Sequence, residues 1–379
     1  MHCRVAVSSV RWIDSDAALH NAVLGWGDTL ALDTEFIRTN TFFPAPGLYQ
    51  VASGDDVYLI DPLPIEDWQP FVNVLADPRV TKVMHACQED LELLYHHLGV
   101  HPEGLFDTQF AHAFLSADYS LSYARLVDVR LGVSLDKHET RSNWLARPLT
   151  EQQIAYAVED VVYLVPLYED LSRDLAAVGR HDWFLEDMVE RGTYQPVDPQ
   201  AYYRNLKKAW QLPPRQLAAL QVLCAWREKR AVQENVPRNR VVWDDHLFAF
   251  ARRERLTAGD IYGAVPRVVA KRYADALLAE HARSAELAQA PEPLPPPLTS
   301  RQGAIVKTLK ASGNRAAEQH GLAPELVSRK KELEECVRHF VATRELAPRF
   351  RSWRQNLVGD EYLRIMLDTW SEAPPEQTS

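Results

Sequence analysis

Residues Thr29–Phe36 have the sequence TLALDTEF, in which apolar and other side chains alternate as they do in a half-buried β-strand. In such a strand Leu30 and Leu32 point to one face, whereas Asp33 and Glu35 point to the other. Two carboxylates on an interior face are unfavourable by several kcal/mol unless a cation neutralises them. An isolated Asp-x-Glu pair also occurs at exposed strand ends, so the pair alone leaves a divalent-cation site and a solvated pair both open.

The segments that follow predict the sheet to which this strand belongs. Leu48–Ala52 and Val57–Ile60 are short apolar segments separated by a turn, and they predict two more strands of an antiparallel meander. Val80–His85 predicts a fourth strand, which leads into an amphipathic helix. Thr150 and Gln153 form a capping-box sequence before another helix. We therefore expect an α/β fold in which helices cover a sheet.

Three further residues extend the pair of carboxylates. Asp90 lies in the first turn of the helix that follows the fourth strand, and Tyr156 and Asp160 are four residues apart on one helix face. Each has an ordinary alternative, either an acid favoured at a helix N-terminus or a surface Asp beside a half-buried Tyr. Together with the first pair they give four carboxylates, with a charge of about −4 that two Mg²⁺ or Mn²⁺ ions would balance.

Three segments resemble the ordered motifs of the DEDD exonuclease superfamily, namely LDTEF at 32–36, HACQEDL at 85–91 and YAVEDV at 156–161. The Tyr-x₃-Asp spacing in the last segment is similar to that of the tyrosine subclass. Four more segments, and with them almost the whole chain, resemble the ribonuclease D family: residues 36–51, 59–63, 105–115 and 135–150. The resemblance implies an RNase H-like α/β exonuclease fold that removes nucleotides by hydrolysis in the 3′→5′ direction.

The resemblance also implies roles for the residues. Asp33, Glu35, Asp90 and Asp160 are then catalytic residues that hold two divalent metal ions (Mg²⁺ or Mn²⁺), and Tyr156 positions the attacking water. The implied partner is RNA with a free 3′ end, in particular a tRNA precursor that is trimmed to its mature 3′ terminus. A DNA 3′–5′ exonuclease with the same mechanism, or a non-catalytic RNA-binding scaffold, is the alternative.

Charge and proline content predict the division of the chain. Residues 1–200 carry 13 Lys and Arg against 31 Asp and Glu, whereas residues 201–290 carry 16 against 9. Pro291–Leu298 has the sequence PEPLPPPL, which predicts an extended linker. We therefore expect three domains: an exonuclease domain over residues 1–199, an all-helical domain over 208–288 and a second, diverged helical domain over 298–372.

The first helical region resembles the helicase-and-RNase-D C-terminal (HRDC) domain over residues 211–285, and residues 300–370 resemble a diverged second copy. Basic residues in and around these regions are candidates for phosphate contacts, which give affinity without sequence readout. The alternative is a solvated helix face. The candidates are Arg227, Lys229, Arg230, Arg238 and Arg240 in the helical region, and His138 and Arg141 in the preceding one.

Other classes of protein are disfavoured by the sequence. No apolar run approaches the roughly 18 residues that a membrane span needs, so we expect no membrane partner. The four cysteines are widely separated, which fits a reducing compartment and predicts a cytoplasmic location. A glycine-rich phosphate loop is absent from the sequence, so ATP hydrolysis is not supported. No obligate protein partner is evident.

Overall fold

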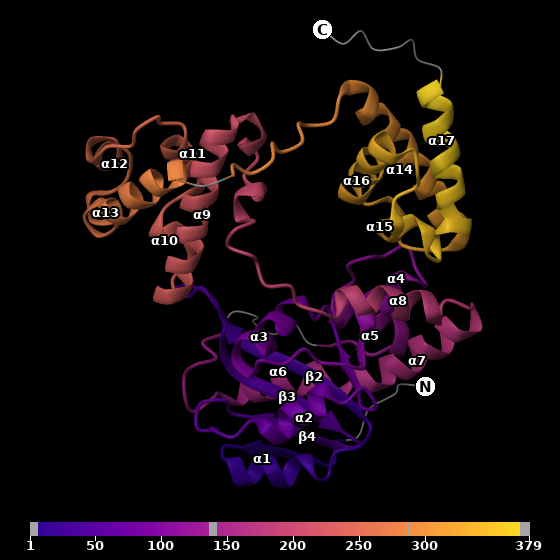
Figure 1. Cartoon of the computed structure of the whole chain (residues 1–379). Helices are drawn as coiled ribbons and strands as arrows, with labels where there is room; N and C mark the ends of the chain where they lie inside the picture. The colour runs from indigo at the N-terminus through magenta and orange to yellow at the C-terminus, as the bar shows by residue number, and fades with distance from the viewer. Residues whose placement is uncertain (1–6, 136–141, 287–288, 372–379) are drawn as a thin grey trace. The chain divides into compact units, whose positions relative to one another are not determined.

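The structure is a computed structural model that describes residues 7–135, 142–286 and 289–371 (Figure 1). These residues form two compact units. Unit 1 contains the chain up to Phe36, residues Pro46–Tyr194, and the chain from Leu298 onward. Unit 2 contains Ile37–Ala45 and Gln195–Pro297. The three-domain division stays a prediction, and each unit is described by itself below.

Unit 1 is built on a six-stranded sheet with the strand order β1-β4-β3-β2-β5-β6. β1 pairs with β4, β2 with β5 and β5 with β6 in parallel, whereas β3 and β4 are antiparallel. The predicted meander is therefore present as the consecutive neighbours β2, β3 and β4. Two edge strands, β1 and β6, were not predicted. The strands are β1 (Ser9–Ile13), β2 (Thr29–Ile37), β3 (Ala45–Ser53), β4 (Asp56–Ile60), β5 (Thr81–Met84) and β6 (Leu105–Asp107).

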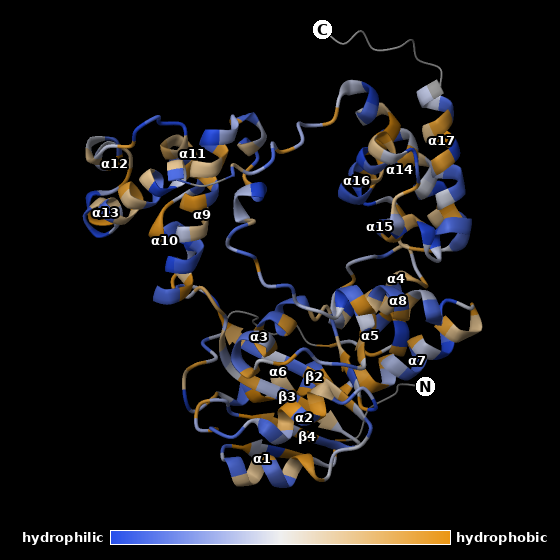
Figure 2. Cartoon of the chain, viewed as in Figure 1, coloured by the Kyte–Doolittle hydropathy of each residue, from blue (hydrophilic) through white to orange (hydrophobic). Residues whose placement is uncertain are grey.

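The alternation in β2 separates a core face from a functional face. Leu30 and Leu32 are buried in one cluster with residues of the three helices that follow β1, β4 and β5. Those helices contribute Leu19, Phe71 and Leu91 to the cluster. The strands in the middle of the sheet are predominantly hydrophobic (Figure 2). Asp33 and Glu35 consequently point to the opposite face, as the sequence predicts.

Eight helices accompany the sheet in the part of unit 1 before residue 195 that the structure describes. The sixth begins with the predicted capping box, in which the Thr150 side chain accepts from the Gln153 amide and the Gln153 side chain accepts from the Thr150 amide. The helices are α1 (Asp16–Val23), α2 (Gln69–Ala76), α3 (Gln88–Leu98), α4 (Thr108–Ala113), α5 (Tyr123–Leu131), α6 (Glu151–Val162), α7 (Leu164–Ala177) and α8 (His181–Arg191).

The C-terminal helices pack against α4 and α8 as part of unit 1. Arg354 is almost completely buried and forms an ion pair with Asp187 on α8. The rings of Trp183 and Trp353 stack with their centroids 4.8 Å apart, and the Ala323 amide donates to a carbonyl of α4. This region therefore shares a core with the sheet domain. Its helices are α14 (Ser300–His320), α15 (Glu325–Ser328), α16 (Lys330–Thr343) and α17 (Asp360–Ser371).

Unit 2 is helical and has its own core around the long helix α9. The segment between β2 and β3 belongs to this unit, because the Asn235 side chain accepts hydrogen bonds from the amides of Phe42 and Phe43, at 3.0 and 3.2 Å. The helices are α9 (Pro214–Glu234), α10 (Arg238–Val241), α11 (Asp244–Ala251), α12 (Ala258–Ala264) and α13 (Arg267–Arg283). None of the helices in the described ranges combines the length and the apolar character that crossing a membrane requires.

Candidate active site

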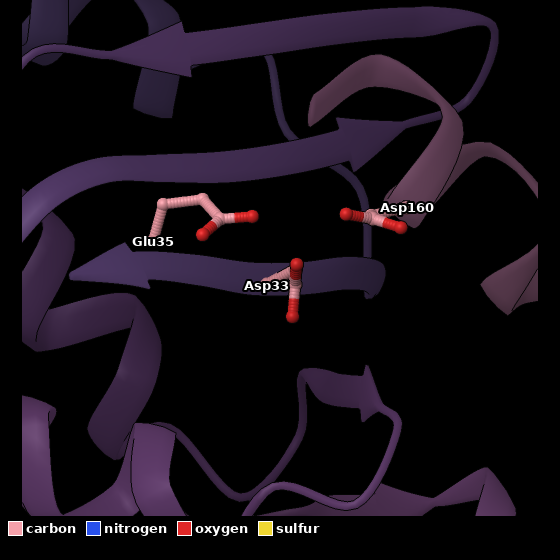
Figure 3. Close-up of side chains that lie close together, drawn as sticks. All are labelled: Asp33, Glu35 and Asp160. Carbon is pink, nitrogen blue, oxygen red and sulfur yellow. The ribbon is translucent and has the colours of Figure 1, made fainter. Parts of the chain in front are cut away.

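Three carboxylates meet on the functional face of β2 (Figure 3). Asp33 and Glu35 project from alternate positions of the strand, and Asp160 reaches the same place from α6. One oxygen from each of the three side chains lies within 4.8 Å of the others. Residues separated by more than a hundred positions are thus brought together, as the sequence predicts for Asp33, Glu35 and Asp160.

Asp90, the fourth predicted carboxylate, lies beside this cluster but not in it. It is in the first turn of α3 and only 8% exposed, and its Oδ1 accepts a hydrogen bond from the Thr34 hydroxyl. Among the residues that the structure describes, the group close enough to share one ion comprises only Asp33, Glu35 and Asp160. Thr34 therefore holds Asp90 from the core face of β2, a role that the sequence analysis missed. Thr34 could have been noticed in the sequence because it is a polar residue at a position that strand alternation places in the core.

Burial raises the pKa values of all four carboxyl groups, and repulsion from the other carboxylates of the site raises those of Asp33 and Glu35 further. The pKa of Asp33 is well above its usual range because the group is desolvated and faces Asp90, Asp160 and Glu35. Desolvation, with repulsion from Asp160 and Asp90, raises the pKa of Glu35 to about 8. Desolvation raises the pKa of Asp160 to about 7 and that of Asp90 to about 6. Such a cluster is relieved by a cation, and its oxygen-only donors suit a hard divalent metal ion.

Tyr156 contacts the cluster from the same helix face as Asp160, one turn earlier. Its hydroxyl donates a hydrogen bond to Asp160, which opposes the upward shift of the Asp160 pKa. Desolvation and the nearby carboxylates raise the pKa of Tyr156 itself, so the phenol stays protonated at neutral pH. The arrangement therefore offers a neutral hydroxyl beside the carboxylates.

The segment before α6 is fastened to the sheet by Arg147. Its guanidinium donates to both carboxylate oxygens of Asp61 at 2.6 Å and to the Gly47 carbonyl at 2.7 Å. A Cβ on Gly47 would lie 2.5 Å from the Cβ of Trp144, so only glycine allows this segment to approach β3 so closely. These contacts fix the start of α6 and hence the position of Asp160.

The turn before α3 is held by Asp107, which is completely buried at the end of β6. Its Oδ1 accepts from the Ala86 amide at 3.0 Å, in a turn where Ala86 has a φ of 55°, an uncommon value for a residue with a side chain. Its Oδ2 accepts from Nε of Arg191 at 3.2 Å and lies 3.7 Å from Sγ of Cys87, the residue immediately before α3. Asp107 therefore positions the helix that carries Asp90.

The structure corrects the prediction for Arg227, which is only 1% exposed and cannot reach a phosphate. Its guanidinium donates to Glu228, Asp244 and the Val242 carbonyl at 2.8–2.9 Å. Arg227, in the middle of α9, is therefore part of a buried ion-pair network that stabilises the fold. Its neighbours Trp226 and Glu228 are buried as well, although the basic residues Lys229 and Arg230 that follow suggested an exposed helix face.

The other predicted RNA contacts divide into three groups. Arg238 is partly engaged in the fold, since its Nε donates to Glu228 at 2.6 Å and its guanidinium lies over the Phe42 ring. Lys229 and Arg240 are exposed, and Arg230 is half-buried beside Glu234. His138 and Arg141 lie outside the described residues. The predictions for these residues therefore stay predictions.

Comparison with known proteins agrees with the fold. The model of a 3′–5′ exonuclease family matches residues 10–176, and that of the HRDC domain matches residues 216–280. A ribonuclease D of Pseudomonas paraeruginosa is 42% identical over 373 residues, which cover 96% of this chain and 99% of the relative. A ribonuclease D of Escherichia coli is 42% identical over 241 residues, 63% of this chain and 64% of the relative.

Solved structures extend the likeness to three dimensions. The crystal structure of Escherichia coli RNase D, described as an exoribonuclease involved in structured RNA processing, has a TM-score of 0.87 at 32% identity. The match covers 95% of this chain and 99% of that one. The catalytic core of RRP6 from Trypanosoma brucei shares the fold, with a TM-score of 0.56 at 20% identity over 74% of this chain and 80% of that one. The expected α/β exonuclease domain followed by helical HRDC-type structure is confirmed. This chain belongs to the ribonuclease D family of 3′–5′ exoribonucleases.

Proposed function

We propose that this exoribonuclease trims structured RNAs, in particular tRNA precursors, to their mature 3′ ends. The observation that carries the proposal is the meeting of Asp33, Glu35 and Asp160 oxygens within 4.8 Å of one another on a half-buried face. The similarity to a ribonuclease involved in structured RNA processing supports the substrate class. The free cysteines of the described chain fit a reducing compartment, and we propose a cytoplasmic location on that ground.

The catalytic residues in this proposal are Asp33, Glu35, Asp90, Asp160 and Tyr156. The four carboxylates hold two divalent ions, Mg²⁺ or Mn²⁺, which supply charge stabilisation and a more acidic water when they are bound. Asp90 joins the other three by exchanging its hydrogen bond from Thr34 for a ligand role. The neutral Tyr156 hydroxyl orients the attacking water toward the scissile phosphodiester.

The division of labour follows the charge distribution. Residues 1–199 form the exonuclease domain in this proposal, and residues 208–288 and 298–372 form the two HRDC-type domains. Residues 201–290 carry an excess of basic side chains. Such side chains suit contacts with the phosphates of the RNA body, where no base has to be recognised. Lys229, Arg230, Arg238 and Arg240, and outside the described residues His138 and Arg141, are the proposed phosphate contacts.

A time course on a 3′-extended tRNA and on a DNA of matched sequence tests the proposal, with Mg²⁺, Mn²⁺ or EDTA present. We expect stepwise shortening of the RNA from its 3′ end with either metal ion and none with EDTA. Faster shortening of the DNA would favour the DNA exonuclease alternative. Binding of RNA without release of mononucleotides under any metal condition would favour a scaffold and overturn the proposal.

A further inference from the structure

Unit 2 contains a pocket of about 580 Å³ that the proposed function has not used. It lies where α10, α11 and α13 begin, and Pro237, Arg240, Trp243, His246, Val265 and Val268 are among the residues that line it. Trp243 is 58% exposed, more than any other tryptophan that the structure describes. A large apolar ring left in solvent at the edge of a pocket indicates a surface for a ligand.

The charge of the pocket selects an anionic ligand. None of the described residues that line it is acidic, and Arg240 is exposed there without an ion-pair partner in the described part of the chain. The neighbouring Asp244 is neutralised by Arg227 at 2.8 Å. α13 begins at the pocket without a side-chain cap and without an acidic residue in its first turn, so its first amides are unpaired within the helix and add to the positive potential.

We propose that this pocket is a nucleotide-binding subsite in which one base of a single-stranded RNA stacks on Trp243 while the adjoining phosphate pairs with Arg240. An aromatic platform beside a cation is the arrangement that binds single strands without sequence preference. The apolar lining from Val265 and Val268 complements the face of a base and not a fully hydrated phosphate. This inference rests on the proposed function, because it gives the body of the bound RNA a binding site in unit 2.

The test uses the full chain in EDTA, which prevents hydrolysis, and a fluorescein-labelled oligouridylate of about 16 nucleotides. Trp243→Ala should raise the Kd measured by fluorescence anisotropy about 5-fold or more, and Trp243→Phe should raise it less. Trp210→Ala is the matched control, because Trp210 is also exposed in unit 2 but does not line the pocket. It should leave the Kd unchanged.

Arg240→Gln tests the phosphate contact separately. Its loss should reduce the slope of log K against log salt by about 0.7, the contribution of one phosphate contact in a single strand. Irradiation of an oligonucleotide that contains 5-iodouridine should attach it to Trp243, as peptide mapping by mass spectrometry would show. Thermal unfolding of the variants verifies that they fold.

Two results would overturn the inference. One is a Kd and a salt slope that neither variant changes, which is also the result expected if the pocket binds a protein partner. The other is photochemical attachment only outside the pocket. These results are distinguishable from failure of the proposed function, because wild-type protein would still shorten RNA with Mg²⁺. If the proposed function failed, wild-type protein would release no mononucleotides from any RNA.

Discussion

The hydroxyl of Tyr156 donates a hydrogen bond to the carboxylate of Asp160, one turn further along α6. The pair shares a helix face because residues four apart are neighbours on an α-helix. The same bond that holds the tyrosine in place stabilises the ionised form of Asp160 against the pKa increase that burial causes. We therefore expect removal of the Tyr156 hydroxyl to affect the orientation of the attacking water, and removal of the Asp160 carboxylate to affect metal binding.

Tyr156→Phe should lower kcat about 10- to 100-fold, since a hydrogen bond to a charged or reacting group contributes ~1.5–3 kcal/mol. The metal concentration for half-maximal activity should change much less, because all four carboxylates remain. Steady-state kinetics at saturating metal together with a metal titration separates the two effects. Tyr168→Phe is a control, since Tyr168 packs on Phe106 within the fold. An unchanged kcat for Tyr156→Phe would remove the proposed role in orienting water.

The affinity for metal ions should depend on pH. Without metal, the pKa values of Asp90, Asp160 and Glu35 are raised to about 6, about 7 and about 8. Protons compete with the cation for these carboxylates, so the apparent affinity should increase as the pH rises through this range and become constant above it. Calorimetric titration in two buffers of different ionisation enthalpy should detect proton release near pH 7. An affinity that is the same from pH 6 to pH 9 would contradict this prediction.

Asp107→Asn should weaken metal binding although Asp107 is not a proposed ligand. The substitution removes the buried ion pair with Arg191 and disturbs the turn at Ala86 that precedes α3. Because outer residues orient ligands, we expect the metal concentration for half-maximal activity to rise roughly 10-fold. A purely structural role would lower the melting temperature alone. Asp128→Asn serves as control, since Asp128 forms an exposed pair with Arg125.

Arg354→Met should destabilise unit 1 by about 3–5 kcal/mol, because it leaves the Asp187 carboxylate buried without its cation. The second change Asp187→Leu in the same chain should restore part of the lost stability, since an apolar pair of similar size carries no buried charge. Denaturant unfolding of the single and double variants measures both. Arg364→Met, which breaks an exposed pair with Glu361, should change stability by less than about 1 kcal/mol.

Much of the fold follows from local sequence patterns. The alternation in residues 29–36 predicted β2, and the capping-box sequence at Thr150 predicted the start of α6; both are present. Both predictions were possible because each element depends on interactions within a few residues. The edge strand β6 has three residues, too few for any period to be visible. Its existence depends on pairing with β5, an interaction that no local pattern records.

The sequence also predicted part of the candidate site, namely three of its carboxylates. The order and spacing of the acids led to Asp33, Glu35 and Asp160, which do meet. The hydrogen bond from Thr34 to Asp90 is a tertiary contact between residues 56 positions apart, and it is invisible in sequence. Arg227 was wrongly predicted to contact RNA. It lies among other basic residues, and the sequence does not show that Glu228 and Asp244 form ion pairs with it inside the fold.

The most direct test of the account is the release of nucleoside 5′-monophosphates from RNA by Asp160→Asn in Mg²⁺, compared with wild type and with Asp182→Asn, whose side chain is fully exposed on α8. Asp160 is the acid that α6 must bring to β2 if the carboxylates form one metal site. We predict that Asp160→Asn loses at least about 100-fold in rate while RNA binding and the melting temperature in EDTA are retained, and that Asp182→Asn behaves as wild type. Wild-type turnover by Asp160→Asn would contradict the account.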